Sequence, residues 1–197
     1  MTRSLIAILS LATVSSVVPE FAGLGFRHIV PDGLDHILFI LGLFFLSRDV
    51  HTLLLQVTLF TMAHSLTLGL AMKGLLSVNT QVVEIFIALS IAFIAAENLM
   101  GERLSRWRPW MVFGFGLIHG LGFAHSFGEM PVSAAHFMEA LFSFNVGIEL
   151  GQLTVVGLAF AALAAWWHRD WYLGVIARPA SVSIALAGLY LAVERSL

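Results

Sequence analysis

Apolar stretches alternate with short polar segments along the whole chain. Seven of them stand out, at residues 5–18, 34–46, 53–72, 82–100, 110–127, 140–167 and 173–193. A helix needs about 20 apolar residues to cross the hydrocarbon layer of a bilayer, and several stretches have that length. Proline, glycine and charged residues lie between them, as is typical of loops. The pattern predicts an all-α, polytopic membrane helical bundle of about seven transmembrane helices, forming a single domain over residues 1–197.

The first stretch has two interpretations, and they do not affect the placement of the later loops. Arg3 precedes a short apolar core that ends near small residues, which is also the pattern of a cleaved signal peptide; cleavage would leave six helices. We favour a retained helix. Membrane proteins keep Lys and Arg on the cytoplasmic side. With the N-terminus inside, the inner side holds Arg3, Arg48, Arg103, Arg106, Arg108, Arg169 and Arg178, and the outer side only Arg27, Lys73 and Arg195, which predicts an N-in, C-out topology.

The composition agrees with a membrane protein and excludes other classes. Hydrophobic residues make up 59% of the chain and charged residues 11%, and the mean hydropathy is +0.93. The net charge of −2, without a basic cluster, excludes a nucleic-acid partner, which would require many Lys and Arg contacts to phosphates. Cysteine is absent, so disulfides and thiolate metal sites are excluded. Any metal must be held by nitrogen and oxygen.

The densest group of chemically active side chains is the segment H-I-V-P-D-G-L-D-H. It contributes His28, Asp32, Asp35 and His36. Pro31 and Gly33 interrupt helical geometry, so the four side chains can converge from a loop and a helix N-terminus. Such convergence suits a divalent cation, and we predict that all four contact a metal. The alternative for Asp35 alone is that it caps the following helix.

Three further ionisable side chains lie within apolar stretches, where insertion of a charged residue costs roughly 2.5–3.5 kcal/mol. They are His64 in the third stretch, His119 in the fifth and Glu149 in the sixth. We predict that they complete the metal site. The alternatives are that His64 hydrogen-bonds a neighbouring helix and that Glu149 is protonated and hydrogen-bonded. The glycines around His119, at positions 114, 116, 120 and 122, are typical of close helix packing.

Other polar side chains are predicted to line the route of an ion. They are Ser65, Glu84, Glu97, Asn98, Asn145 and Gln152. Asn145 and Gln152 fall with Glu149 on one face of the sixth stretch. The alternative for Glu84 and Glu97 is an ordinary place at the membrane interfaces. The predicted topology puts the His and Asp residues and Glu149 at one depth, in the outer half of the bilayer, which favours a single site.

The histidine motifs resemble those of the HupE/UreJ family of bacterial membrane proteins. His28, Asp35 and His36 are similar to the family's His-rich signature, His119-Gly120 to its His-Gly segment, and Ala63-His64 to its A-H motif. The spacing from His28 to Asp35 and the F-N-x-G-x-E-x-G-Q segment indicate a divergent branch. The resemblance implies a multi-pass nickel or cobalt permease of the bacterial inner membrane, surrounded by lipid. A homo-oligomer or a partner subunit is left open.

Three hypotheses of function follow from the residues. Nitrogen and oxygen ligands suit nickel, cobalt, zinc or manganese and disfavour copper(I), so the first hypothesis is a permease for a divalent metal ion; no P-loop for ATP is found. The second is an intramembrane zinc-dependent hydrolase acting on a lipid-like substrate, with Ser65 and Glu149 assisting. The third is an accessory subunit of a membrane complex. A polar path to the inner face would favour transport, and a closed cavity opening sideways to lipid would favour hydrolysis.

Overall fold

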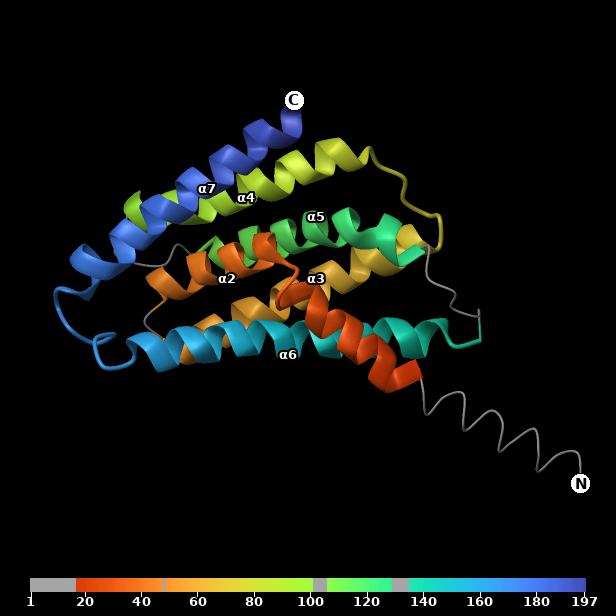
Figure 1. Cartoon of the computed structure of the whole chain (residues 1–197), viewed down its shortest axis with the longest axis horizontal. Helices are drawn as coiled ribbons and strands as arrows, with labels where there is room; N and C mark the ends of the chain where they lie inside the picture. Colours follow the sequence, from red (N-terminus) through yellow and green to blue (C-terminus); the bar gives the residue numbers. More distant parts are fainter. Residues whose placement is uncertain (1–16, 48, 101–105, 129–134) are drawn as a thin grey trace, which may run out of the picture.

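The computed structural model describes residues 17–47, 49–100, 106–128 and 135–197, with the backbone alone described for 124–128. This part of the chain is almost entirely helical and contains no strand. A helix over Val17–Ile29 is followed by α2 (Leu34–Leu46), α3 (Val50–Met72), α4 (Thr80–Met100), α5 (Arg108–Gly128), α6 (Phe137–Leu163), a π-helical turn η1 (Leu173–Ala177) and α7 (Arg178–Ser196). They form one elongated bundle (Figure 1). The predicted all-α membrane fold is confirmed, and the predicted stretch 5–18 lies almost wholly outside the described residues.

Within the described part of the chain, four segments are long and apolar enough to cross a membrane: α3, α4, α6 and the continuous segment Leu173–Ser196. The helix Val17–Ile29 and α2 are bent by 68° and add a fifth span if they count as one. The sequence predicted a separate span at 34–46, but the 13 residues of α2 rise only about 20 Å, short of the roughly 30 Å hydrocarbon layer. The 21-residue α5 has the length of a span, carries several glycines and packs between α3 and α4. The N-in, C-out sidedness stays a prediction.

The two ends of the bundle provide a frame for the site. At the mouth end, α3 ends at Met72 and α4 and α6 begin; at the Arg108 end, α4 ends at Met100 and α5 begins. The chain break at residues 30–33 lies inside the length of the bundle (Figure 1). The break that Pro31 and Gly33 predicted is present. The helix Val17–Ile29 that precedes it runs along α6, where Ile29 packs against Gly151.

Glycines bring the helices of the site into backbone contact. A Cβ atom at Gly116 would collide with the backbone of Phe60, and one at Gly120 with the carbonyl oxygen of His64, so α5 and α3 touch main chain to main chain. The predicted packing role is confirmed for these two glycines and for Gly122, which meets Ile87 of α4. The prediction is wrong for the glycine at position 114, because a Cβ atom there would meet no other atom within 4 Å.

The helix Val17–Ile29 and α6 meet in the same way. Gly25 faces the carbonyl oxygen of Phe144, and Gly147 faces that of Ala22, so that neither position has room for a Cβ atom. α2 also depends on a missing side chain, since a Cβ at Gly42 would lie 3.0 Å from Ile94 of α4. The first arm of the bent pair is thus seated on α6, and α2 packs against both α4 and α6.

The surface of the bundle is apolar and several polar side chains are inside it. Large hydrophobic side chains project outward from α3, α4 and α6, among them Met62 at 60%, Phe86 at 53% and Phe142 at 72% exposure. Gln56, His64 and Gln152, by contrast, are at most 1% exposed. A soluble protein would arrange these classes the other way round. The distribution fits a surface that faces lipid.

Candidate functional site

Four histidine side chains from four helices gather near the middle of the bundle. His28 comes from the helix Val17–Ile29, His36 from α2, His64 from α3 and His119 from α5. The ring centroids of His36 lie 4.7 Å from His28, 5.6 Å from His64 and 5.0 Å from His119, and those of His28 and His64 are 5.8 Å apart. We call these four side chains the His layer. His36, His64 and His119 are buried, and His28 is partly buried.

Most ring nitrogens of the His layer have no hydrogen-bond partner among the described residues. The buried, unpartnered atoms are Nε2 of His28, Nε2 of His36, both nitrogens of His64 and Nδ1 of His119. Nε2 of His119 lies 3.0 Å from the hydroxyl of Ser90, which donates its own proton to the carbonyl oxygen of Ile87 at 2.6 Å. The Ser90 oxygen therefore accepts from Nε2–H of His119, and the lone pair of that ring resides on Nδ1.

The spacing of the rings can be compared with that around a metal ion. Four imidazoles bound to one ion through nitrogens about 2.1 Å away would have their ring centroids about 5 Å apart. The measured separations of 4.7–5.8 Å match this spacing. The nitrogens as placed do not point at one centre: among the described residues, no group of three or more His, Asp or Glu side chains has the arrangement that holds a metal ion. The layer brings the rings together, and their metal contact stays a prediction.

A cavity of about 290 Å³ opens on the mouth side of the His layer, and we call it the vestibule. Its polar lining comprises His28, Asp32, Asp35, His36, Glu84, His119 and Arg195. The vestibule therefore connects three of the four imidazoles with the predicted acidic residues at positions 32, 35 and 84.

Asp35 has a partner that the sequence did not indicate. Nη2 of Arg195, near the end of α7, lies 3.0 and 2.8 Å from the two carboxylate oxygens of Asp35. Nη1 of Arg195 donates to the carbonyl oxygen of Glu84 at 3.0 Å. Asp35 stands in the first turn of α2, but the residue at the helix N-cap is Gly33 and no side chain caps the helix. The capping alternative for Asp35 is therefore wrong, and its predicted metal contact competes with a guanidinium.

An apolar floor lies one helical turn from the His layer toward the Arg108 end. It is formed by Phe39, Phe60 and Phe115, which we call the Phe layer. The ring of His119 lies 5.3 Å from that of Phe39 and 5.0 Å from that of Phe60, and Phe39 lies 5.9 Å from Phe115. The predicted polar route from the imidazoles to Glu97 and Asn98 is interrupted at this layer.

Beyond the Phe layer, a fully buried arginine holds the predicted exit residues. Arg108 is 0% exposed, and its Nη1 lies 2.7 Å from Oε2 of Glu97. Arg108 also donates to Oδ1 of Asn98 at 3.3 Å and to the carbonyl oxygen of Gly42 at 3.3 Å. Asn98 donates in turn to Gly42 at 2.8 Å and to Ser181 of α7 at 3.1 Å. We call this group the Arg108 cluster; it joins α2, α4, α5 and α7.

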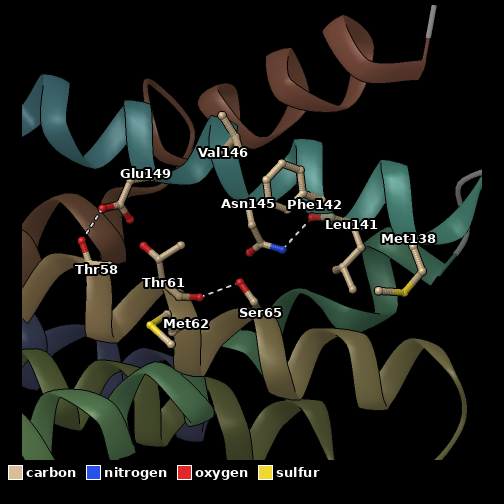
Figure 2. A pocket seen from close by; sticks show the side chains of 10 residues that line it. All are labelled: Thr58, Thr61, Met62, Ser65, Met138, Leu141, Phe142, Asn145, Val146 and Glu149. Atoms are coloured by element: carbon tan, nitrogen blue, oxygen red, sulfur yellow. Dashed lines mark hydrogen bonds between the residues drawn. The ribbon is translucent and has the colours of Figure 1, made fainter. Parts of the chain in front are cut away.

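The remaining predicted residues lie elsewhere, along a groove of about 350 Å³ between α3 and α6. Figure 2 shows Ser65, Asn145 and Glu149 lining it with Thr58. Glu149 accepts a hydrogen bond from Thr58 at 2.7 Å, and Asn145 donates to a backbone carbonyl of its own helix at 2.7 Å. Gln152, the last of the predicted stripe, is buried and accepts from Thr61 of α3 at 2.8 Å. The structure thus separates Glu149 from the His layer.

Two functional positions were missed because their partners are remote in sequence. Arg108 and Arg195 entered the sequence analysis only as topology signals. Arg195 is 160 residues from Asp35 in the sequence, and no motif near either residue predicts that they form an ion pair. The position of Arg108 just before an apolar stretch is equally typical of an interfacial arginine.

Comparison with known proteins gives one match. A family model described as HupE / UreJ protein matches residues 6–195 of the chain. No curated protein and no solved structure matches significantly.

Proposed function

The chain belongs to the HupE/UreJ family, and on that premise we propose that it is a permease for a divalent transition-metal ion of the nickel or cobalt type in the bacterial inner membrane. This family is associated with nickel and cobalt transport. The observation that carries the proposal is the His layer: four imidazoles from four helices, with five buried ring nitrogens that lack a hydrogen-bond partner among the described residues.

The energetics of burial support a ligand for this layer. A buried polar atom without a partner costs about 1–3 kcal/mol, so five such nitrogens cost roughly 5–15 kcal/mol together. That sum is comparable to the whole stability of a typical domain, about 5–15 kcal/mol. A cation coordinated by one lone pair of each ring would offset this cost for at most four of the five nitrogens, because a neutral imidazole has a single in-plane lone pair. Imidazole nitrogen is also a preferred ligand of nickel, cobalt and zinc.

The fold suggests how the ion would move. The vestibule admits it from the mouth end, and His28 and His36, on either side of a broken helix, are the first imidazoles that it meets. Broken helices of this kind build the ion and substrate sites of many transporters near the bilayer midplane. The Phe layer and the Arg108 cluster close the far side, so passage requires them to separate. The proposed path is open at one end in this conformation.

The hydrolase alternative gains no support from the groove. Ser65 and Glu149 line it, but none of the four imidazoles does. A zinc ion bound in the His layer would therefore be separated from the two side chains that were predicted to assist hydrolysis. This separation argues against the predicted hydrolase arrangement, while the polar path to the inner face that would favour transport is interrupted at the Phe layer.

The test is uptake of radioactive nickel or cobalt by proteoliposomes that contain the purified protein. His36→Ala and His119→Ala should reduce uptake to the level of empty liposomes, because each removes one imidazole from the layer. His51→Ala, which changes an exposed histidine at the start of α3, is the matched control and should transport like the wild type. Unchanged uptake in both layer variants would refute the proposal, and bound zinc without flux in the wild type would favour an enzyme.

A further inference from the structure

The vestibule contains a positive charge that belongs to the protein itself. Arg195 reaches from α7 to Asp35 of α2, with one guanidinium nitrogen contacting both carboxylate oxygens at 3.0 and 2.8 Å. The side chains of Arg195 and Asp35 are only 20% and 23% exposed. This cation therefore lies directly against the acidic side chain that precedes His36 in the sequence.

The net charge of the vestibule lining depends on this residue. Asp32, Asp35 and Glu84 contribute three carboxylates, and Arg195 contributes one guanidinium, which leaves a net charge of −2 when all are ionised. Asp32 and Glu84 are exposed and attract cations of any kind from solution. Asp35 differs because it is partly buried beside the His layer.

The type of ligand atom that is free decides which cations bind well. Carboxylate oxygens suit hard cations such as magnesium and calcium, whereas imidazole nitrogens suit nickel, cobalt and zinc. Both oxygens of Asp35 are engaged by Arg195, so an entering ion does not find this carboxylate free. The buried ligand atoms that remain unpartnered on this side are nitrogens of the His layer, whereas the carboxylates of Asp32 and Glu84 are exposed.

We propose that Arg195 is a specificity-determining residue of the permease, which withholds Asp35 from hard divalent cations and leaves the imidazoles to select the ion. The inference rests on the proposed transport function for its biological meaning. The inference itself is about which metal ions bind, and metal affinity can be measured without measuring transport.

A merely structural role for Arg195 makes a different prediction. Its backbone carbonyl accepts a hydrogen bond from Gln81 at 3.1 Å, and its side chain links α7 to α4 through Glu84. Loss of a tether lowers stability but does not change which metal ion binds. The relative affinity for magnesium and nickel therefore separates the two roles.

The experiment measures magnesium and nickel binding to the detergent-purified, full-length protein by isothermal titration calorimetry. Arg195→Gln should bind magnesium at least about tenfold more tightly than the wild type, since Asp35 becomes free. Arg195→Gln combined with Asp35→Asn should return magnesium binding to the wild-type level. Arg195→Lys, which keeps the charge, should stay closer to the wild type than Arg195→Gln.

Arg169→Gln, which removes an exposed arginine before α7, is the matched control for loss of one positive charge. Magnesium affinity that is equal in the wild type and folded Arg195→Gln would overturn the inference, as would an increase that persists after Asp35→Asn. In proteoliposomes, Arg195→Gln should also make nickel uptake more sensitive to added magnesium. A wild type without nickel uptake would contradict the proposed function alone, because the calorimetric comparison still decides the role of Arg195.

Discussion

Two arginine–carboxylate pairs lie on opposite sides of the His layer, and they differ in how deeply they are buried. Arg195 and Asp35 are about one-fifth exposed and line a cavity. Arg108 is 0% exposed, pairs with Glu97 and also donates to Asn98 and to a backbone carbonyl. A guanidinium at the edge of water can be displaced from its partner at small cost, whereas a buried one cannot be separated from its partner without leaving an uncompensated charge. An arginine–carboxylate pair can thus influence ion binding at the mouth end, as proposed for Arg195, and hold helices together at the Arg108 end.

The largest expected effect is on the buried side of this comparison. Arg108→Gln should destabilise the protein by about 3–5 kcal/mol, because Glu97 and Asn98 lose their charged donor inside the bundle. This corresponds to a fall in melting temperature of roughly 6–20 °C for a protein of this size. Thermal unfolding of the detergent-purified protein measures it. Arg106→Gln, which changes an exposed arginine two residues earlier, should melt like the wild type. Equal melting temperatures of the two variants would show that the Arg108 cluster does not stabilise the bundle.

A smaller effect is expected for the same substitution at the mouth end. Arg195→Gln should cost no more than about 1 kcal/mol, since a partly exposed pair is screened by water and ions. The melting temperature should fall by roughly 4 °C or less under the conditions used for Arg108→Gln. A fall as large as that of Arg108→Gln would mean that Arg195 is chiefly a tether of α7, and the contrast between the two ends would disappear.

The smallest effect is expected outside both ends, in the groove between α3 and α6. Glu149→Gln keeps an oxygen that can accept from Thr58, and the residue does not line the vestibule. Nickel uptake by proteoliposomes should remain at the wild-type rate. A loss as complete as that expected for His36→Ala would place Glu149 on the route of the ion and would require a path that joins the groove to the His layer.

The sequence predicted the features that local physics dictates. Apolar stretches of sufficient length announced the helical membrane bundle, because a lipid environment leaves the backbone no other way to satisfy its hydrogen bonds. Pro31 and Gly33 announced the chain break, and the rings of His28 and His36 on either side of it lie 4.7 Å apart. The gathering of His64 and His119 at the same layer was also predicted, from a shared depth.

Features that depend on how helices rotate and tilt were not predicted. Glu149, which was predicted to share the depth of the imidazoles, accepts from Thr58 and lines a groove between α3 and α6 that none of the four imidazoles lines. The pairs of Arg108 and Arg195 join helices whose contact no single stretch of sequence specifies. The apolar run at 34–46 predicted a helix, but nothing in the sequence showed that this helix forms one bent pair with the helix Val17–Ile29 before the break.

The bend between the helix Val17–Ile29 and α2 has a geometric consequence for the four imidazoles. His64 and His119 belong to α3 and α5, which touch backbone to backbone at Gly120 and so behave as one wall. His28 and His36 lie on two arms that are bent by 68° relative to each other; the first is seated on α6, and α2 packs against α4 and α6. The angle of that bend therefore helps to set the gap between the rings of His28 and His36. The positions of His64 and His119 are set separately, by the contact of α3 with α5.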